Sequence, residues 1–231
     1  MINIAIIPAR GGSKRIPKKN IRDFFGKPII YYTIKAAIDS LLFDEVIVST
    51  DDIEIKEIAL KFGAKVPFMR SAKNSTDFAN TADTLLEVLN EYESNGFTFD
   101  NICCLYPTAP FITPEKLKLS YNIFLNGNYD SFFPVQRYSY PIQRALKIEN
   151  NRTSMIHPEN MNKRSQDLEP AFHDCGQFYW LKNSSFKLQK RIFMDYSGSV
   201  EYTDTEVQDI DNEMDWKIAE IKFGLLSSNQ M

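Results

Sequence analysis

The chain has 231 residues, of which 43% are hydrophobic and 25% charged, and its formal net charge is -3. This length and composition are ordinary for a soluble globular protein with a sizeable core, and the slightly acidic balance argues against a general nucleic-acid binder. No apolar run approaches the ~20 residues that a membrane span needs, and no signal peptide opens the chain. We therefore expect a cytoplasmic protein without nucleic-acid or membrane partners.

Apolar runs of strand length alternate with longer segments of helical period, which is typical of an α/β fold with a mainly parallel sheet. The expected strands of the first part are 2–7, 45–49, 65–68, 101–105 and 130–135. The expected helices there, which start at a proline or at polar capping residues, are 28–40, 53–62, 81–93 and 114–125. Strands at 175–181 and 199–202 and a helix at 213–223 complete the pattern.

The regular alternation stops between residues 137 and 170, where prolines, aromatic residues and polar residues are mixed. Only weak strand signals occur there, near 143–148. A long irregular stretch inside a compact domain is usually functional or involved in assembly. We predict one domain over residues 1–231 that carries residues 137–170 as an inserted arm or lid.

A cationic, glycine-containing loop follows the first expected strand. Residues 9–27 hold seven Lys or Arg and one acid, Asp23, for a local charge of +6, and the loop contains Gly11 and Gly12. Glycines let backbone amides approach an anion closely, and clustered cations neutralise it. The position after a strand favours a phosphate-binding loop over a merely solvated basic loop.

Two aspartates near the other end of the chain form the second candidate site. Residues 201–215 hold seven acids and no Lys or Arg. In an extended segment Asp209 and Asp211 share one face while Ile210 packs inward. Such carboxylates suit Mg²⁺, which takes one or two of them plus substrate phosphates, although Asp211 or Asn212 could instead only cap the following helix. Loop and carboxylates together predict a site for a metal-bound polyphosphate at the strand ends.

Five segments together resemble the acylneuraminate cytidylyltransferase family, whose members make CMP-activated nonulosonic acids. They are PARGGSKRIPKKN (8–20), STDD (49–52), YPTAPF (106–111), RSQDLEP (164–170) and DIDNEMDW (209–216), and they occur in the family's order. The resemblance implies a Rossmann-like, GT-A-like nucleotidyltransferase fold, a three-layer sandwich with a mainly parallel mixed sheet. It also implies CMP transfer from CTP to the anomeric hydroxyl of a nonulosonic acid, with Mg²⁺ as cofactor. It further implies a homodimer, with residues 137–170 serving dimerisation and the sugar site.

The resemblance also implies roles for individual residues. Positions that match the CTP-binding residues of the family are Arg10, Gly11, Gly12, Ser13, Lys14, Asn20, Arg70, Ala79 and Thr81. Positions that match its metal-binding pair are Asp209 and Asp211, and these act in catalysis together with Arg10 and Lys14. Positions that lie in its sugar-binding segments are Tyr106, Arg164, Gln166, Gln177 and Tyr179.

Two departures from the sialic acid members of the family narrow the choice of acceptor sugar. Those members have a glutamine at the position of Tyr106 and a different strand where this chain has Cys175 to Tyr179. With Tyr106 and the stretch from His173 to Trp180, the chain most resembles the members that use pseudaminic acid. Pseudaminic acid has a terminal methyl group and a second acylamino group, so its site should exchange hydrogen-bonding amides for aromatic surface. Phe178 and Trp180 fit this pattern too, although Trp180 is better explained as strand core. Of the two histidines, His173 is the better candidate for a catalytic role.

Several alternatives remain open at this point. Sialic, legionaminic and deoxyoctulosonic acids would undergo the same chemistry as acceptors. In a metal-dependent glycosyltransferase, Asp209 to Asp211 would be the Asp-x-Asp motif. In a non-catalytic nucleotide-binding protein, the basic loop would dock an acidic partner.

Overall fold

A seven-stranded mixed sheet forms the centre of the structure, a computed structural model in which residues 1–76 and 79–228 are described. Its order is β11-β6-β10-β5-β1-β4, with β9 paired to β6. The strands are β1 (Asn3–Pro8), β4 (Glu45–Ser49), β5 (Asn101–Leu105), β6 (Ser131–Arg137), β9 (Phe172–Asp174), β10 (Phe178–Lys182) and β11 (Ser197–Glu201). Only β9 and β10 run against the direction shared by the other five strands, which confirms the predicted mainly parallel mixed sheet.

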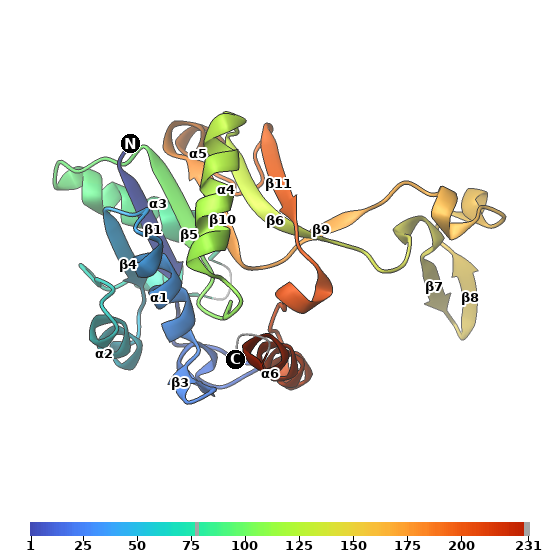
Figure 1. The fold of residues 1–231 in the computed structure, drawn as a ribbon, viewed down its shortest axis with the longest axis horizontal. Coiled ribbons are helices and arrows are strands. Elements are labelled where there is room, and N and C mark those ends of the chain that lie inside the picture. Colours follow the sequence, from blue (N-terminus) through green and yellow to red (C-terminus); the bar gives the residue numbers. More distant parts are fainter. Residues whose placement is uncertain (77–78, 229–231) are drawn as a thin grey trace.

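Helices cover both faces of this sheet (Figure 1). One face carries α1 (Ile30–Ser40), α2 (Ile53–Lys61) and α4 (Pro114–Asn126), and the other carries α3 (Thr81–Ser94) and α5 (Asn183–Gln189). Alternate residues of β1 serve the two layers: Ala5 and Ile7 belong to the first core cluster, and Ile4 and Ile6 to the second. This period of two is what a central strand requires, and the predicted three-layer sandwich is confirmed.

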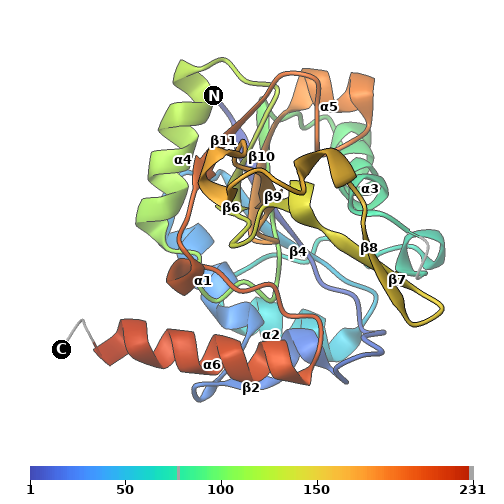
Figure 2. The same ribbon diagram turned by 90° about the vertical axis from the view of Figure 1, so that its right-hand side faces the viewer.

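The C-terminal helix α6 (Glu213–Ser228) packs beside the small hairpin of β2 (Asp23–Phe24) and β3 (Lys27–Pro28) rather than on the sheet (Figures 1 and 2). The shared contact is a third core cluster, whose buried members are Ile16, Phe24, Ile29, Phe111, Ile210, Trp216 and Ala219. Ile16 comes from the cationic loop and Ile210 lies between the two aspartates. A single apolar cluster therefore joins the two charged segments from opposite ends of the chain.

The inserted arm leaves the sandwich at the end of β6 and returns through β9, and it projects well away from the body (Figure 1). Its far part holds the hairpin of β7 (Leu146–Glu149) and β8 (Arg152–Met155). Three short 3₁₀ turns, Ile142–Arg144, Pro158–Asn160 and Ser165–Asp167, surround this hairpin. The boundaries of the irregular stretch in the sequence thus coincide with a physical projection.

Three expected element boundaries differ from the structure for local reasons. The first helix starts at Ile30 rather than at Pro28, because Lys27–Pro28 pairs with Asp23–Phe24. The expected strand at 65–68 is reduced to a single bridge between Lys65 and Ile47, since Pro67 has no N–H to extend the ladder. The strand expected from residue 175 begins at Phe178, because Gly176 has a positive φ of 60° and separates it from β9.

The sequence also left several short elements unpredicted, α5 and β9 among them, and ended one helix too early. Helix α5 has seven residues and strand β9 has three, too few for a periodic pattern. The last helix runs to Ser228 instead of ending at 223. No helix in the described ranges is long and apolar enough to cross a membrane.

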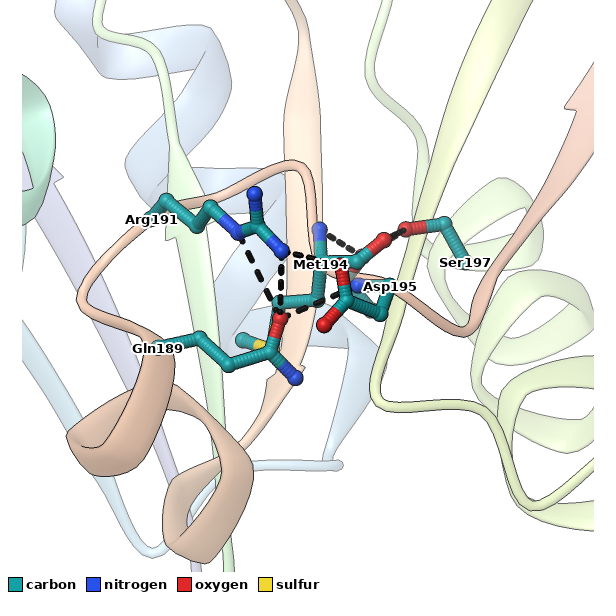
Figure 3. Close-up of polar contacts among 6 residues, drawn as sticks. Gln189, Arg191, Met194, Asp195 and Ser197 are labelled. Carbon is teal, nitrogen blue, oxygen red and sulfur yellow. Dashed lines mark hydrogen bonds and ion pairs between the residues drawn. The ribbon is translucent and has the colours of Figure 1, made fainter.

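The loop after α5 is fixed by a compact polar network that brings β11 alongside β6 (Figure 3). The side-chain oxygen of Gln189 accepts from the Arg191 guanidinium at 3.2 Å and from the Asp195 backbone N–H at 3.0 Å, and Arg191 also pairs with Asp195. The Ser197 hydroxyl donates to the Met194 carbonyl at 2.7 Å. These contacts fix the start of the edge strand.

Candidate active site

A pocket of about 250 Å³ opens where β1 and β5 end. Eight of the predicted site residues line it: Arg10, Ser13, Lys14, Asn20, Arg70, Ala79, Thr81 and Tyr106. Arg15 and Lys19 line it as well. Residues separated by almost a hundred positions meet here because the carboxyl ends of neighbouring strands lie at one edge of the sheet. The strongly cationic wall suits a polyphosphate.

The cationic loop is held in place by hydrogen bonds that each join a side chain to a backbone group. The buried Asn20 donates its side-chain amide to the Arg10 carbonyl at 2.9 Å. The Gly11 N–H donates to an Asp51 carboxylate oxygen at 2.9 Å, and the Arg10 guanidinium donates to the Thr76 carbonyl at 3.3 Å. In this structure Asn20 therefore shapes the loop, and the first glycine amide binds the segment after β4.

The two glycines of the loop have different surroundings, which leads to a prediction. A methyl group on Gly11 would lie 2.5 Å from an Asp52 carboxylate oxygen and 2.8 Å from its Cβ, whereas one on Gly12 meets nothing within 4 Å. We expect Gly11→Ala to lower the free energy of unfolding by about 1–3 kcal/mol. Gly12→Ala should change it by less than about 0.5 kcal/mol.

Urea unfolding of both variants measures this difference, and calorimetric titration with CTP measures the functional consequence. Gly12→Ala should fold normally yet bind CTP more weakly, if its lack of a side chain serves the approach of phosphate. Equal stabilities of the two variants would contradict the structural assignment of Gly11.

Arg70 provides a fixed cation on the wall of the pocket. Its side chain is buried, with Nε donating to the Ser49 hydroxyl at 3.1 Å and Nη2 donating to the Ser49 carbonyl. Burial lowers the pKa of Arg70, while the nearby Asp51 and Glu87 carboxylates oppose that shift. Guanidinium groups stay protonated in proteins, so Arg70 presents a preorganised positive charge.

The predicted carboxylate pair faces the cationic loop. Ile210 is fully buried, as the alternation predicted, while Asp209 is exposed and Asp211 is partly exposed. Asp211 Oδ1 lies 2.8 Å from Arg15 Nη2 and 3.8 Å from Lys19 Nζ. The two oppositely charged segments therefore meet directly.

The helix-cap interpretation of this segment is also confirmed, and of its two candidates the cap is Asn212. The Asn212 side-chain oxygen accepts from the N–H groups of Met214 and Asp215 at 2.8 and 3.0 Å. Asp215 in turn accepts from the Asp211 N–H at 2.9 Å. The Asp211 carboxylate thus does not serve as the cap and instead pairs with Arg15 and Lys19 of the cationic loop.

Partial desolvation of its carboxylate, followed by the negative charge of Asp211, raises the pKa of Asp209 above its ordinary value. A divalent cation offsets the repulsion between two neighbouring carboxylates, and Mg²⁺ prefers hard oxygen donors. No cluster of three or more His, Cys, Asp or Glu able to hold a metal occurs within residues 1–76 and 79–228. Two carboxylates would suit a Mg²⁺ ion that takes its other ligands from phosphate and water.

Of the predicted sugar residues, Tyr106 alone reaches this pocket. Its hydroxyl lies 3.2 Å from the Thr81 hydroxyl, and burial raises the pKa of Tyr106 to about 12, so the phenol is neutral. Tyr179 is buried against it, with its hydroxyl donating to Asp174. Gln177 is fully buried and donates to the Glu206 carbonyl at 3.2 Å.

The remaining predicted sugar residues lie on the arm. Arg164 is exposed and pairs with Asp167 at 2.7 Å, and Gln166 lines a separate pocket of about 350 Å³ at the root of the arm. His173 packs against Tyr138 there, outside the nucleotide pocket. The structure thus distributes the five predicted sugar residues over the pocket, the core and the arm.

Two further expectations concern the strand β10. Phe178 and Trp180 are fully buried, and the Trp180 indole N–H donates to the Ser120 hydroxyl at 3.0 Å. The core interpretation of Trp180 is confirmed, and Phe178 is likewise core instead of sugar-binding surface. Both side chains face the layer of α1, α2 and α4, because alternate residues of a strand share one face.

Sequence reasoning assigned no role to Arg15, Lys19 or Asp51, which the structure places at the site. Burial lowers the pKa of Lys19, and its ammonium donates to the Ile210 carbonyl at 2.6 Å. Lys19 and Arg15 contributed to the charge count of the loop, but a count does not show which cations turn inward. Asp51 stood in the quoted STDD segment without an assigned partner.

Comparisons with known proteins place the chain in a family. A model of the cytidylyltransferase family matches residues 4–218. The pseudaminic acid cytidylyltransferase of Campylobacter jejuni is 42% identical over 224 residues, which are 96% of this chain and 97% of that protein. The CMP-N,N'-diacetyllegionaminic acid synthase of Legionella pneumophila is 33% identical over 94% of this chain and 94% of that protein.

Among solved structures, CMP:2-keto-3-deoxy-manno-octonic acid synthetase complexed with CTP superimposes with a TM-score of 0.72 over 100% of both chains. Its sequence identity is 16%, so this likeness shows the fold. The family model and the relatives together cover nearly the whole chain and all the motifs of the pocket. The chain belongs to the cytidylyltransferase family and is a nucleotidyltransferase.

Proposed function

We propose that this protein transfers CMP from CTP to the anomeric hydroxyl of pseudaminic acid, that it releases pyrophosphate, and that it does so in the cytoplasm. The observation that carries the reaction is the 2.8 Å contact between Arg15, which lines the pocket, and Asp211 of the carboxylate pair. The relative named for pseudaminic acid, 42% identical over nearly the full length, supports this acceptor over the legionaminic acid of the 33% identical relative.

The residues of the pocket suit an in-line displacement. The anomeric oxygen forms a bond to the α-phosphorus, the bond to the bridging oxygen of the β-phosphate breaks, and the hydroxyl proton passes to solvent. Arg10 and Lys14 would bind the departing pyrophosphate and stabilise its charge. Asp209 and Asp211 would hold Mg²⁺, which supplies charge stabilisation at the phosphate oxygens. Arg70 would keep the nucleotide oriented from the opposite wall.

Tyr106 is proposed to select the acceptor. We expect kcat/KM for pseudaminic acid to exceed that for sialic and legionaminic acids in a panel at fixed CTP and Mg²⁺. Tyr106→Gln should lower kcat/KM for pseudaminic acid by about 10–100-fold, because a pocket shaped for aromatic surface then holds an unpaired amide. Tyr106→Phe, which keeps the ring, should lower it less.

Pyrophosphate release is the readout, since a glycosyltransferase would release none from CTP. A preference of the unaltered protein for sialic acid would contradict the proposed role of Tyr106. Absence of CTP turnover with every acceptor would contradict the proposed function itself.

The arm is proposed to pack on a second copy of the chain and to complete the sugar site there. Arg164 and Gln166 lie on the arm and outside the nucleotide pocket of their own chain. The arm also exposes large apolar side chains, with Tyr140 83%, Ile148 74% and Leu146 60% exposed. Exposed apolar surface of this kind marks a protein–protein contact. A monomeric mass at micromolar concentration would contradict the homodimer.

A further inference from the structure

Arg15 connects the two halves of the site. It lines the nucleotide pocket, and its guanidinium lies 2.8 Å from Asp211 Oδ1. The same side chain therefore touches the proposed metal ligand and faces the space proposed for the triphosphate. Arg15 lies outside the set of residues that the family resemblance assigns.

The ion pair engages Oδ1, one of the two oxygens that Asp211 could offer a metal. A cation in contact with a carboxylate competes with a divalent ion for the same oxygen, and the two cations repel each other at this range. In the conformation seen here, Asp211 has Arg15 as its nearest cation, with Lys19 further away at 3.8 Å. Metal binding to Asp211 through Oδ1 requires Arg15 to withdraw.

Of the two cations, Arg15 is the one able to move. The side chain of Lys19 is 20% exposed and tied to the Ile210 carbonyl at 2.6 Å. The side chain of Arg15 is 68% exposed, so it can reorient without disturbing the packing. A guanidinium also matches phosphate oxygens with paired hydrogen bonds, which makes the triphosphate a suitable second partner.

We propose that Arg15 exchanges partners when CTP binds. Its guanidinium moves from Asp211 to the triphosphate, and the Asp211 carboxylate is then free to bind the metal. This inference rests on the proposed function and deepens it. It makes metal and nucleotide binding depend on each other: without nucleotide the metal site is closed by Arg15, and with nucleotide it opens. By linkage, each ligand then raises the affinity for the other by the same factor.

The test compares Arg15→Gln with the unaltered protein in two binding measurements. Electron paramagnetic resonance measures Mn²⁺ binding without nucleotide, and Arg15→Gln should bind Mn²⁺ about tenfold more tightly because the competing cation is gone. Calorimetry without metal measures CTP binding, and Arg15→Gln should bind CTP about tenfold more weakly while binding cytidine as before. The coupling between the two ligands should fall accordingly.

Lys18→Gln is the matched control. Lys18 lies in the same loop and its side chain is 67% exposed, but it turns to Glu54 of α2, with Nζ 2.5 Å from the carboxylate. The Lys18→Gln substitution removes one positive charge from the same loop, as Arg15→Gln does, and the two side chains are almost equally exposed. Both affinities should stay within about twofold of the unaltered protein if proximity to Asp211, and not net charge, is responsible.

Unchanged or weaker Mn²⁺ binding by Arg15→Gln would overturn the inference, as would unchanged CTP binding by that variant when the unaltered protein binds CTP. Equal effects of Lys18→Gln and Arg15→Gln would also overturn it, because general electrostatics would then suffice. Failure of the unaltered protein to bind CTP would instead overturn the proposed function.

Discussion

Replacing Asp211 with Asn is expected to lower kcat for pyrophosphate release by about a thousandfold, and Asp209→Asn should have an effect of similar size. Loss of one of two carboxylates at a metal site removes several kcal/mol of charge stabilisation, and about 4 kcal/mol corresponds to a thousandfold change in rate. The fold should persist, because the Asp211 backbone N–H still donates to Asp215 and Asn212 still caps α6. Steady-state rates at saturating CTP and acceptor, together with a thermal unfolding curve, measure both expectations.

Glu213→Gln provides the control for this prediction. Glu213 lies two residues beyond Asp211, its side chain is 54% exposed, and it pairs with Arg22 at 2.6 Å on the outer side of the helix start. Its replacement removes one acid from the same segment and should leave kcat within about twofold, since an exposed ion pair contributes about 0–1 kcal/mol to stability. A near-normal rate of Asp211→Asn would mean that these aspartates only shape the helix start.

The sequence predicted most accurately those parts whose signals are local. Strands 45–49 and 101–105 have the expected limits, because parallel strands covered on both faces appear as continuous apolar runs. The cationic loop and the carboxylate pair were visible as opposite runs of charge. In both cases neighbouring residues alone carried the information.

The parts that could not be predicted depend on contacts between distant segments. Phe24, Phe111 and Trp216 form one cluster although almost two hundred residues separate the first from the last. Nothing in the local sequence of Arg15 distinguishes it from Lys18, yet one turns to Asp211 and the other to Glu54. Partner choice of this kind is set by the packing of the third cluster.

Burial was the other missing quantity at two of the predicted sugar-binding residues. Gln177 and Tyr179 lie in segments that match those the family uses on the sugar acid, so the resemblance pointed to a binding role. The structure buries both: the Gln177 side-chain amide donates to the Glu206 carbonyl while its Oε1 has no partner among the described residues, and the Tyr179 hydroxyl donates to Asp174. Buried polar groups normally find protein partners, and which partner lies within reach depends on the tertiary structure.

Because the third cluster joins the charged segments, Trp216→Ala should impair nucleotide binding as well as stability. Trp216 is 1% exposed, packs edge-on against Phe24 at 5.6 Å and lies under the Arg22 guanidinium at 4.6 Å. Its removal should lower the free energy of unfolding by about 3–5 kcal/mol. It should also weaken CTP binding, since Ile16 and Ile210 lose the common packing that positions the cationic loop beside the carboxylate segment.

Trp180→Ala separates these two effects. Trp180 is also fully buried, but it belongs to the first core cluster and stacks on Phe43 at 5.2 Å, outside the packing between loop and carboxylates. Its loss should cost a similar 3–5 kcal/mol, so about the same fall in unfolding temperature is expected of both variants. Calorimetric titration with CTP and Mg²⁺ below both transitions should then show weaker binding by the Trp216 variant alone. Equal weakening in both would mean that the site depends on overall stability rather than on this cluster.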